Sequence, residues 1–185
     1  MKMQALILSS RILFLIATLL VATASNSQES IFKDGPVIKG FGETAPVLTH
    51  TVSEEATFNI AFDVTNTGKV GEVNRKFNSL ARFINMHVAA GVKKENINLA
   101  LIVHGTAIFD LLNNESYQDK YKADNANAGL LQALMKNNVR VILCGQSAAA
   151  RNIEISQLVT GTEIELSAMT AHALLQQNGY TLNPS

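Results

Sequence analysis

Alternating apolar and polar positions predict the first regular element of the chain, a β-strand from Thr57 to Thr65 that is rich in Phe, Ile and Val. The turn-forming sequence Asn66-Thr67-Gly68 follows this strand. A helix ending at Gly91 is predicted next, because apolar residues recur at helical spacing: Phe77, Leu80, Ala81, Ile84 and Val88. The segment from Ile97 to Val103 is almost continuously apolar, which is typical of a strand in a parallel sheet covered on both faces.

The second half of the chain continues this alternation of strands and helices. A short helical turn is predicted from Ala107 to Leu112, and a polar stretch through Tyr117 and Tyr121 leads into a helix that carries Leu130, Leu131, Leu134 and Met135. The remaining predicted elements are a strand from Val139 to Leu143, a helical segment from Gln146 to about Val159, a strand from Ile164 to Leu166, a helix from Thr170 to Gln177 and a short edge strand from Tyr180 to Leu182.

This order of elements predicts an α/β fold, flavodoxin-like, with a mainly parallel five-stranded sheet and helices on both faces. We expect the strand order 2-1-3-4-5. In such a sheet a ligand crevice lies beyond the carboxyl ends of the strands where the order reverses, here beside strands one and three. Cys144, at the end of strand three, would lie there, with His104 on the far side of strand one.

The first 24 residues have the features of a cleavable signal peptide. Lys2 and Arg11 flank the N-terminal stretch, its core from Ile12 to Ala22 is apolar apart from Thr18, and Ala22-Thr23-Ala24 matches the small-x-small cleavage pattern. Polar residues follow instead of a basic stop-transfer flank, so an uncleaved anchor is the less favoured alternative. We therefore expect an exported, periplasmic protein with a signal peptide (residues 1–24), an irregular arm (25–56) and one domain (57–185).

Charge and cysteine content narrow the classes of function. Loss of Lys2 and Arg11 changes 15 basic and 15 acidic residues to 13 and 15, a formal charge of −2, which does not favour binding to nucleic acid or to a membrane after cleavage. Exported proteins normally use cysteines in pairs, yet this sequence has one, Cys144. It is therefore a buried apolar residue, an intermolecular partner or a reactive thiol.

Cys144 opens the sequence Cys144-Gly145-Gln146-Ser147-Ala148-Ala149-Ala150-Arg151, in which a strand end meets a helix start. Backbone N–H groups and the positive end of that helix would stabilise a thiolate and lower the pKa of the thiol. The alternative is a structural cysteine that caps the strand. A phosphatase-like Cys-x5-Arg loop fails by one residue, because the arginine stands at Arg151 and not at position 150.

His104 is a second candidate, as acid, base or polar wall of the crevice; the alternative is a ring fixed by backbone carbonyl groups. His87 and His172 are interpreted as structural, and His50 lies in the arm. The sequence has no metal-binding motif, no Gly-x-Ser-x-Gly elbow, and a Gly40-Phe41-Gly42 segment that lacks the third glycine of a dinucleotide fingerprint. We expect neither a metal nor a cofactor.

From Ile97 to Tyr180 the chain resembles the DsrE/DsrF-like family. The resemblance is carried by Val103-His104-Gly105, by residues 139–146 around Cys144, by Ala148-Ala149-Ala150-Arg151 and by Gly179-Tyr180. The arm sequence from Gly35 to Gly42, leading to Pro46, resembles the exported branch of the family. Sulfur-relay members often have Arg-Gly where this chain has Arg151-Asn152, so we expect a differently shaped loop there.

The resemblance implies that Cys144 accepts a sulfane sulfur as a persulfide and relays it, with His104 in the site and Gly145, Gln146 and Arg151 as binding residues. It implies a carrier of sulfurtransferase type, whose partners are a sulfur donor or acceptor protein or a small sulfane-sulfur compound. It also implies a homo-oligomer, a trimer or hexamer. The apolar residues Ile108, Phe109, Leu111 and Leu112 either form a contact patch for such an assembly or simply cover the sheet. Two other hypotheses are a non-catalytic oligomeric binding module with a structural Cys144, and a thiol redox sensor.

Overall fold

The computed structural model describes residues 30–183, and the predicted signal peptide lies outside them. From Ile31 onward the chain forms one compact unit. None of the helices in the described part is both long and apolar enough to span a membrane.

A five-stranded parallel sheet forms the centre of this unit, as predicted. Its strands are β1 (Phe58–Val64), β2 (Ile97–Val103), β3 (Arg140–Cys144), β4 (Glu163–Glu165) and β5 (Thr181–Asn183). The predicted order 2-1-3-4-5 is wrong: the order is β4-β3-β2-β1-β5. Strand β2 therefore separates β1 from β3. The strands β1 to β4 follow one another across the sheet, and after β4 the chain returns to the other edge, where β5 pairs with β1.

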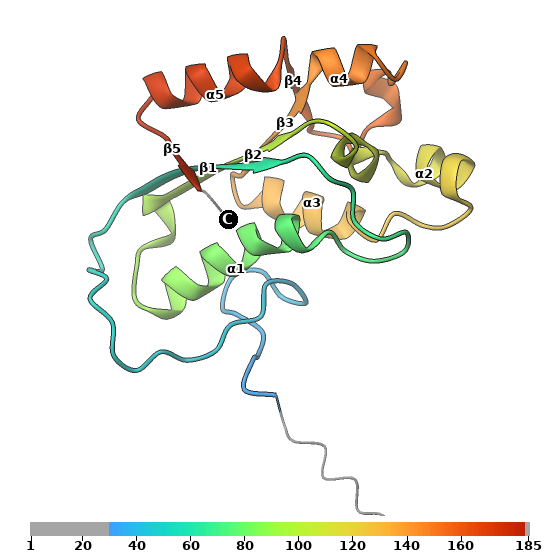
Figure 1. The fold of residues 1–185 in the computed structure, drawn as a ribbon. Helices are drawn as coiled ribbons and strands as arrows, with labels where there is room; N and C mark the ends of the chain where they lie inside the picture. Colours follow the sequence, from blue (N-terminus) through green and yellow to red (C-terminus); the bar gives the residue numbers. More distant parts are fainter. Residues whose placement is uncertain (1–29, 184–185) are drawn as a thin grey trace, which may run out of the picture. The chain divides into compact units, whose positions relative to one another are not determined.

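Helices cover both faces of the sheet, with α1 (Arg75–Ala89) and α3 (Ala128–Lys136) on one face (Figure 1). Alternation along the strands turns Phe62 and Val64 of β1 and Leu99 and Leu101 of β2 toward these helices. They pack with Phe77, Leu80 and Ile84 of α1 and with Leu130, Leu131 and Leu134 of α3, all nearly or fully buried. This face holds the larger hydrophobic core.

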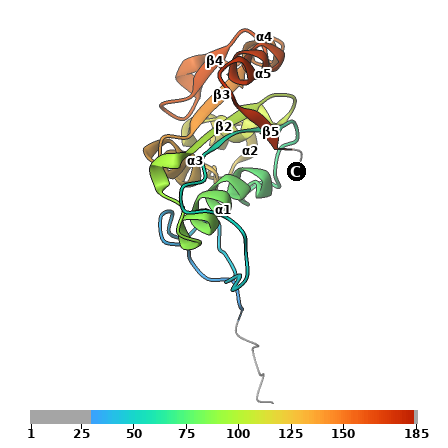
Figure 2. The same ribbon diagram turned by 90° about the vertical axis from the view of Figure 1, so that its left-hand side faces the viewer.

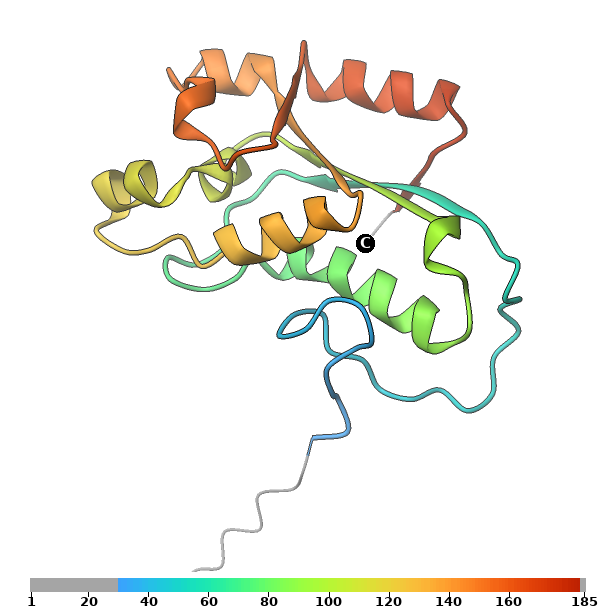
Figure 3. The same cartoon turned by 180° about the vertical axis from the view of Figure 1, so that it is seen from behind.

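The opposite face is covered by α5 (Ala168–Gln177), with the short helix α4 (Gly145–Ala149) beside it (Figures 2 and 3). Its core is smaller and contains several alanines: Ala61, Ala100, Ala168 and Ala171, with Ile102, Ile142, Leu175 and Cys144. Small side chains allow a helix to lie close to the sheet, so polar groups on α5 can reach residues on the strands.

The segment before β1 has no helix or strand in residues 30–57, apart from an isolated bridge between Lys33 and Thr44. It is held on α1 by the buried Asn85. The side-chain oxygen of Asn85 accepts hydrogen bonds from the N–H groups of Val37 and Ile38, at 3.1 and 2.9 Å, and its amide donates to the Ile38 carbonyl. The segment is irregular, as predicted, but it packs on the domain through specific polar contacts.

Three local predictions are wrong. The polar stretch before α3 contains a helix, α2 (Asn114–Tyr121), which begins at Asn113, whose side chain accepts a hydrogen bond from the N–H of Ser116. The helical segment predicted from 146 to 159 is only α4, a turn and a 3-10 turn at Ile155–Gln157. Of the two alternatives for the apolar residues 108, 109, 111 and 112, the contact patch is wrong and the covering of the sheet is confirmed, because Ile108 and Leu111 are fully buried in the larger core.

Candidate functional site

Cys144 is the last residue of β3 and the N-cap of α4, so the strand end meets the helix start as predicted. Its side chain points to the α5 face and is only 6% exposed. The following residue, Gly145, brings α4 close to the end of β4: a Cβ at this position would lie 2.8 Å from the carbonyl oxygen of Glu165. A glycine is therefore needed directly after the cysteine.

Several donor groups act on the pKa of the Cys144 thiol. They are the hydroxyl and N–H of Ser147, the N–H of Ala168 at the start of α5 and the N–H of Gln146. Burial by itself raises the pKa of the thiol, but these hydrogen bonds together outweigh it and lower the pKa below its ordinary value. The site therefore favours a thiolate despite its low exposure.

His104 lies directly beside Cys144. Val103 of β2 pairs with Leu143 of β3 in the parallel register, so the next residue on each strand is also a neighbour. The prediction that His104 lies on the far side of strand one is therefore wrong, and the structure brings the two residues together. Gly105 follows His104 and donates its N–H to the Ser147 hydroxyl oxygen at 3.2 Å, which links the end of β2 to α4.

His104 is held by a carboxylate and not by backbone carbonyl groups. Its Nε2 atom is 3.1 Å from both oxygens of Asp63 on β1, and Nε2 of His172 on α5 is 2.7 Å from Asp63 Oδ1. Burial raises the pKa of Asp63, but the hydrogen bonds from His172 and His104 and the attraction of both rings lower it overall. One ionised carboxylate thus joins two imidazoles, from three elements of the fold.

The predicted binding residues lie around this cluster with different exposures. Gln146 contributes its backbone N–H to the sulfur, while its side chain is exposed. Arg151 is half-buried, and its Nη1 atom donates a hydrogen bond to the Ser147 carbonyl oxygen at 3.4 Å. The guanidinium therefore lies against the loop that holds the thiol, and its described hydrogen bond is to that backbone.

Sequence reasoning missed Asp63, Ser147 and His172 as members of the site. Asp63 could have been found, since it is the one charged residue in the strand. Its neighbours depended on the strand order, which the sequence did not reveal. His87, by contrast, has the surroundings of a structural histidine: Nδ1 is 2.8 Å from the Phe83 carbonyl oxygen and the ring stacks on Phe83.

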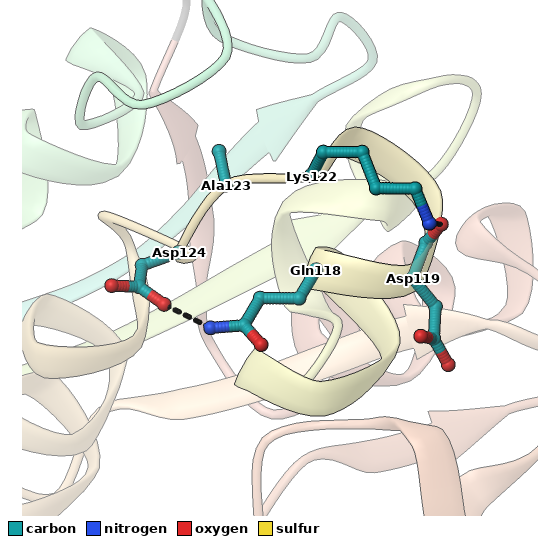
Figure 4. Close-up of a pocket in the computed structure, with 5 residues that line it drawn as sticks. All are labelled: Gln118, Asp119, Lys122, Ala123 and Asp124. Atoms are coloured by element: carbon teal, nitrogen blue, oxygen red, sulfur yellow. Dashed lines mark hydrogen bonds between the residues drawn. The ribbon is translucent and has the colours of Figure 1, made fainter.

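Two further features of the described residues bear on function. No three His, Cys, Asp or Glu side chains among residues 30–183 are arranged to hold a metal ion. A pocket on the surface is lined by residues of α2 and the loop after it, namely Gln118, Asp119, Lys122, Ala123 and Asp124 (Figure 4). None of these residues belongs to the cluster around Cys144.

Comparison with known proteins is consistent with this architecture. The model of the DsrE/DsrF-like family matches residues 62–184. The structure of MTH1491 from Methanobacterium thermoautotrophicum, described as a protein of unknown function, has the same fold: the TM-score is 0.50 at 14% sequence identity, covering 68% of this chain and 97% of that one. The ychN protein from E. coli gives a TM-score of 0.47 at 20% identity, covering 69% and 100%. A comparison with curated proteins gives no match.

Proposed function

Because the chain belongs to the DsrE/DsrF-like family, whose membership suggests sulfur relay, we propose that Cys144 is an acceptor and carrier of sulfane sulfur. The observation that carries this proposal is the position of the only cysteine: Cys144 ends β3 and is the N-cap of α4, and its surroundings lower the pKa of its thiol. A thiolate is the form of cysteine that attacks sulfur. The environment of Cys144 supports that form.

The reaction we propose is an exchange at sulfur. The Cys144 thiolate attacks the outer sulfur of a donor R–S–SH, a bond forms between the two sulfurs, and the S–S bond of the donor breaks to release R–S⁻. The product is a Cys144 persulfide, and no external oxidant or reductant is needed. Because the chain has no second cysteine, the thiol that later takes up the sulfur must come from another molecule.

Donor and acceptor are therefore a partner protein with a thiol, or a small sulfane-sulfur compound. At 6% exposure the Cys144 sulfur admits a slender group such as an extended persulfide more readily than a broad surface. We also propose that the protein is exported to the periplasm after removal of residues 1–24. N-terminal sequencing of exported protein should find a start within about three residues of Ser25, and an intact Met1 would contradict processing.

Intact mass spectrometry of the purified mature protein tests the relay. After incubation with polysulfide or thiosulfate we expect a gain of one sulfur atom, lost on reduction and absent from the Cys144→Ser variant. If Cys144 instead gains oxygen when the protein is treated with an oxidant, and gains no sulfur from these donors, the result would favour a redox sensor. Wild-type protein that gains no sulfur would contradict the carrier.

A non-catalytic binding module is the second candidate, favoured by the burial of Cys144 among apolar residues such as Ile142 and Ala171. In that case the thiol is a packing group, and it should react with iodoacetamide only when the protein unfolds. The carrier hypothesis predicts alkylation of the native protein at neutral pH. The rate of alkylation in native buffer and in urea therefore separates the two.

A further inference from the structure

The bridge of Asp63 between two histidines is not needed to stabilise the Cys144 thiolate. The sulfur receives its hydrogen bonds from Ser147 and from backbone N–H groups, whereas His104 is turned to the carboxylate. The three side chains are also more open than the thiol, with exposures of 31% for Asp63, 30% for His104 and 20% for His172. The bridge is therefore the more solvent-accessible part of the site.

Hydrogen bonding to Asp63 fixes which nitrogen of each ring can exchange a proton. An ionised carboxylate only accepts hydrogen bonds, so both Nε2 atoms must carry hydrogen. In residues 30–183 no hydrogen bond to Nδ1 of His104 is formed, and no buried side-chain nitrogen or oxygen lacks a partner. Nδ1 of His104 is therefore accessible to solvent and makes no hydrogen bond within the described residues.

The proposed sulfur transfer needs a proton at this place. When the S–S bond of the donor breaks, the departing R–S⁻ is formed beside a largely buried sulfur, and an alkyl thiolate is a basic, poor leaving group there. A general acid positioned at the departing atom lowers this barrier. His104 directly follows Val103, the partner of Leu143 in the register, and is therefore placed next to Cys144 as a candidate for this acid.

We propose that Asp63 and His172 are positioning residues that hold His104 as the acid for the leaving thiolate of the sulfur donor. This inference rests on the proposed function, since it concerns the same transfer. The Cys144 thiolate, R–S–SH and protonated His104 give the Cys144 persulfide, R–SH and neutral His104, so that atoms and charge balance. Solvent returns the proton to Nδ1.

Other charged groups on this face are placed differently. Glu165 of β4 pairs with Cys144 in the register and is half-buried. Arg140, earlier on β3, is bound by Glu163 at 2.6 Å. Arg151 donates to the Ser147 backbone. None of these three makes a hydrogen bond to Asp63 or to either histidine within the described residues, so the bridge is separate from them.

The test compares sulfur uptake with alkylation in the Asp63→Asn and His172→Gln variants. Uptake from an alkyl persulfide should fall by about ten- to a hundredfold in Asp63→Asn and by a smaller factor in His172→Gln. Alkylation by iodoacetamide should change less than about twofold, because iodide leaves without a proton.

The leaving group provides a second readout that a purely structural role would not change. With thiosulfate as donor the departing group is sulfite, which is weakly basic and needs little protonation, so the defect of both variants should largely disappear. Asp119→Asn and His50→Gln are matched controls, because both side chains are exposed and outside the site, and they should behave as wild type with both donors.

The outcomes separate this inference from the proposed function. Wild-type protein that takes up no sulfur from either donor contradicts the proposed function itself. Two results would overturn only the role of the bridge. In the first, the wild type takes up sulfur and both variants do so at the same rate. In the second, a variant loses sulfur uptake and alkylation to the same extent. If Asp63→Asn fails to fold, the His172→Gln variant alone tests the inference. An uptake defect of this variant that is equally large with the alkyl persulfide and with thiosulfate would also overturn the role of the bridge.

Discussion

At the scale of single residues, the surroundings of Cys144 make its two small replacements unequal. In Cys144→Ser the hydroxyl can accept the hydrogen bonds that the sulfur accepts, so the free energy of unfolding should change by less than about 1 kcal/mol. In Cys144→Ala the donors lose their acceptor, and we expect a loss of about 1 to 3 kcal/mol. Both variants should lose all sulfur uptake.

Urea unfolding of the two variants measures this difference. Equal destabilisation by serine and alanine would show that the donors do not act on the side chain at position 144, and that Cys144 serves as an apolar packing group. Intact mass spectrometry on the same samples reports sulfur uptake, so stability and function are compared directly.

Ser147 should control the pH dependence of the thiol. Its hydroxyl and N–H are the leading contributions that lower the pKa of Cys144 against the opposing effect of burial. In Ser147→Ala the hydroxyl is lost, the pKa should rise, and the pH midpoint of alkylation should move upward. Ser79→Ala removes an exposed hydroxyl on α1 and is the control. An unchanged midpoint in Ser147→Ala would contradict this account of the thiolate.

At the scale of elements, the sequence predicted the strands and the long helices well because their burial patterns are strong. Strand β2 was predicted with its observed bounds, and all its residues except Asn98 are buried. Helix α2 was missed because its sequence is polar, with Tyr117 as its one buried side chain, so it has no apolar stripe to recognise. Its stability comes from the cap at Asn113 and from contacts that the fold provides.

Helix α4 was predicted too long because its run of alanines favours a helix. The left-handed conformation of Asn152 instead ends the helical segment. Asn152 adopts the left-handed conformation, with φ of +51°, which closes the turn after Arg151. Glycine adopts this conformation readily, and asparagine adopts it more often than most other residues do. The expectation of a loop shaped differently from that of members with Arg-Gly stays a prediction.

Substitution at Asn152 tests this explanation. Asn152→Gly should change the free energy of unfolding by no more than a few tenths of a kcal/mol, whereas Asn152→Val should lower it by about 1 to 2 kcal/mol, because a β-branched residue is strained at positive φ. Thermal unfolding of both variants provides the measurement. Equal stability of the glycine and valine variants would contradict a left-handed residue at this position.

At the scale of the whole molecule, the fold class could be predicted, while the strand order could not. Alternation of strands and helices identifies a parallel sheet, but it does not state which strand lies beside which. The order β4-β3-β2-β1-β5 decides that His104 lies next to Cys144, and that Asp63 lies across β2 from it. The candidate site depends on these long-range pairings, and so its carboxylate and its second histidine could not be assigned from local pattern.

A second surface, beside the start of α5, offers exposed apolar residues for self-association in place of the buried Ile108 and Leu111. The exposed large apolar residues of the described part include Leu166 and Met169, at 69% and 80%, beside Ala168, whose N–H contacts the Cys144 sulfur. If the protein forms the proposed trimer or hexamer through this surface, a Leu166→Lys, Met169→Lys double variant should have a lower mass by light scattering at micromolar concentration. Leu48→Lys, at 96% exposure in the segment before β1, is the control and should leave the mass unchanged. A monomeric wild type would remove the association, and a variant that keeps the wild-type mass would place the contact elsewhere.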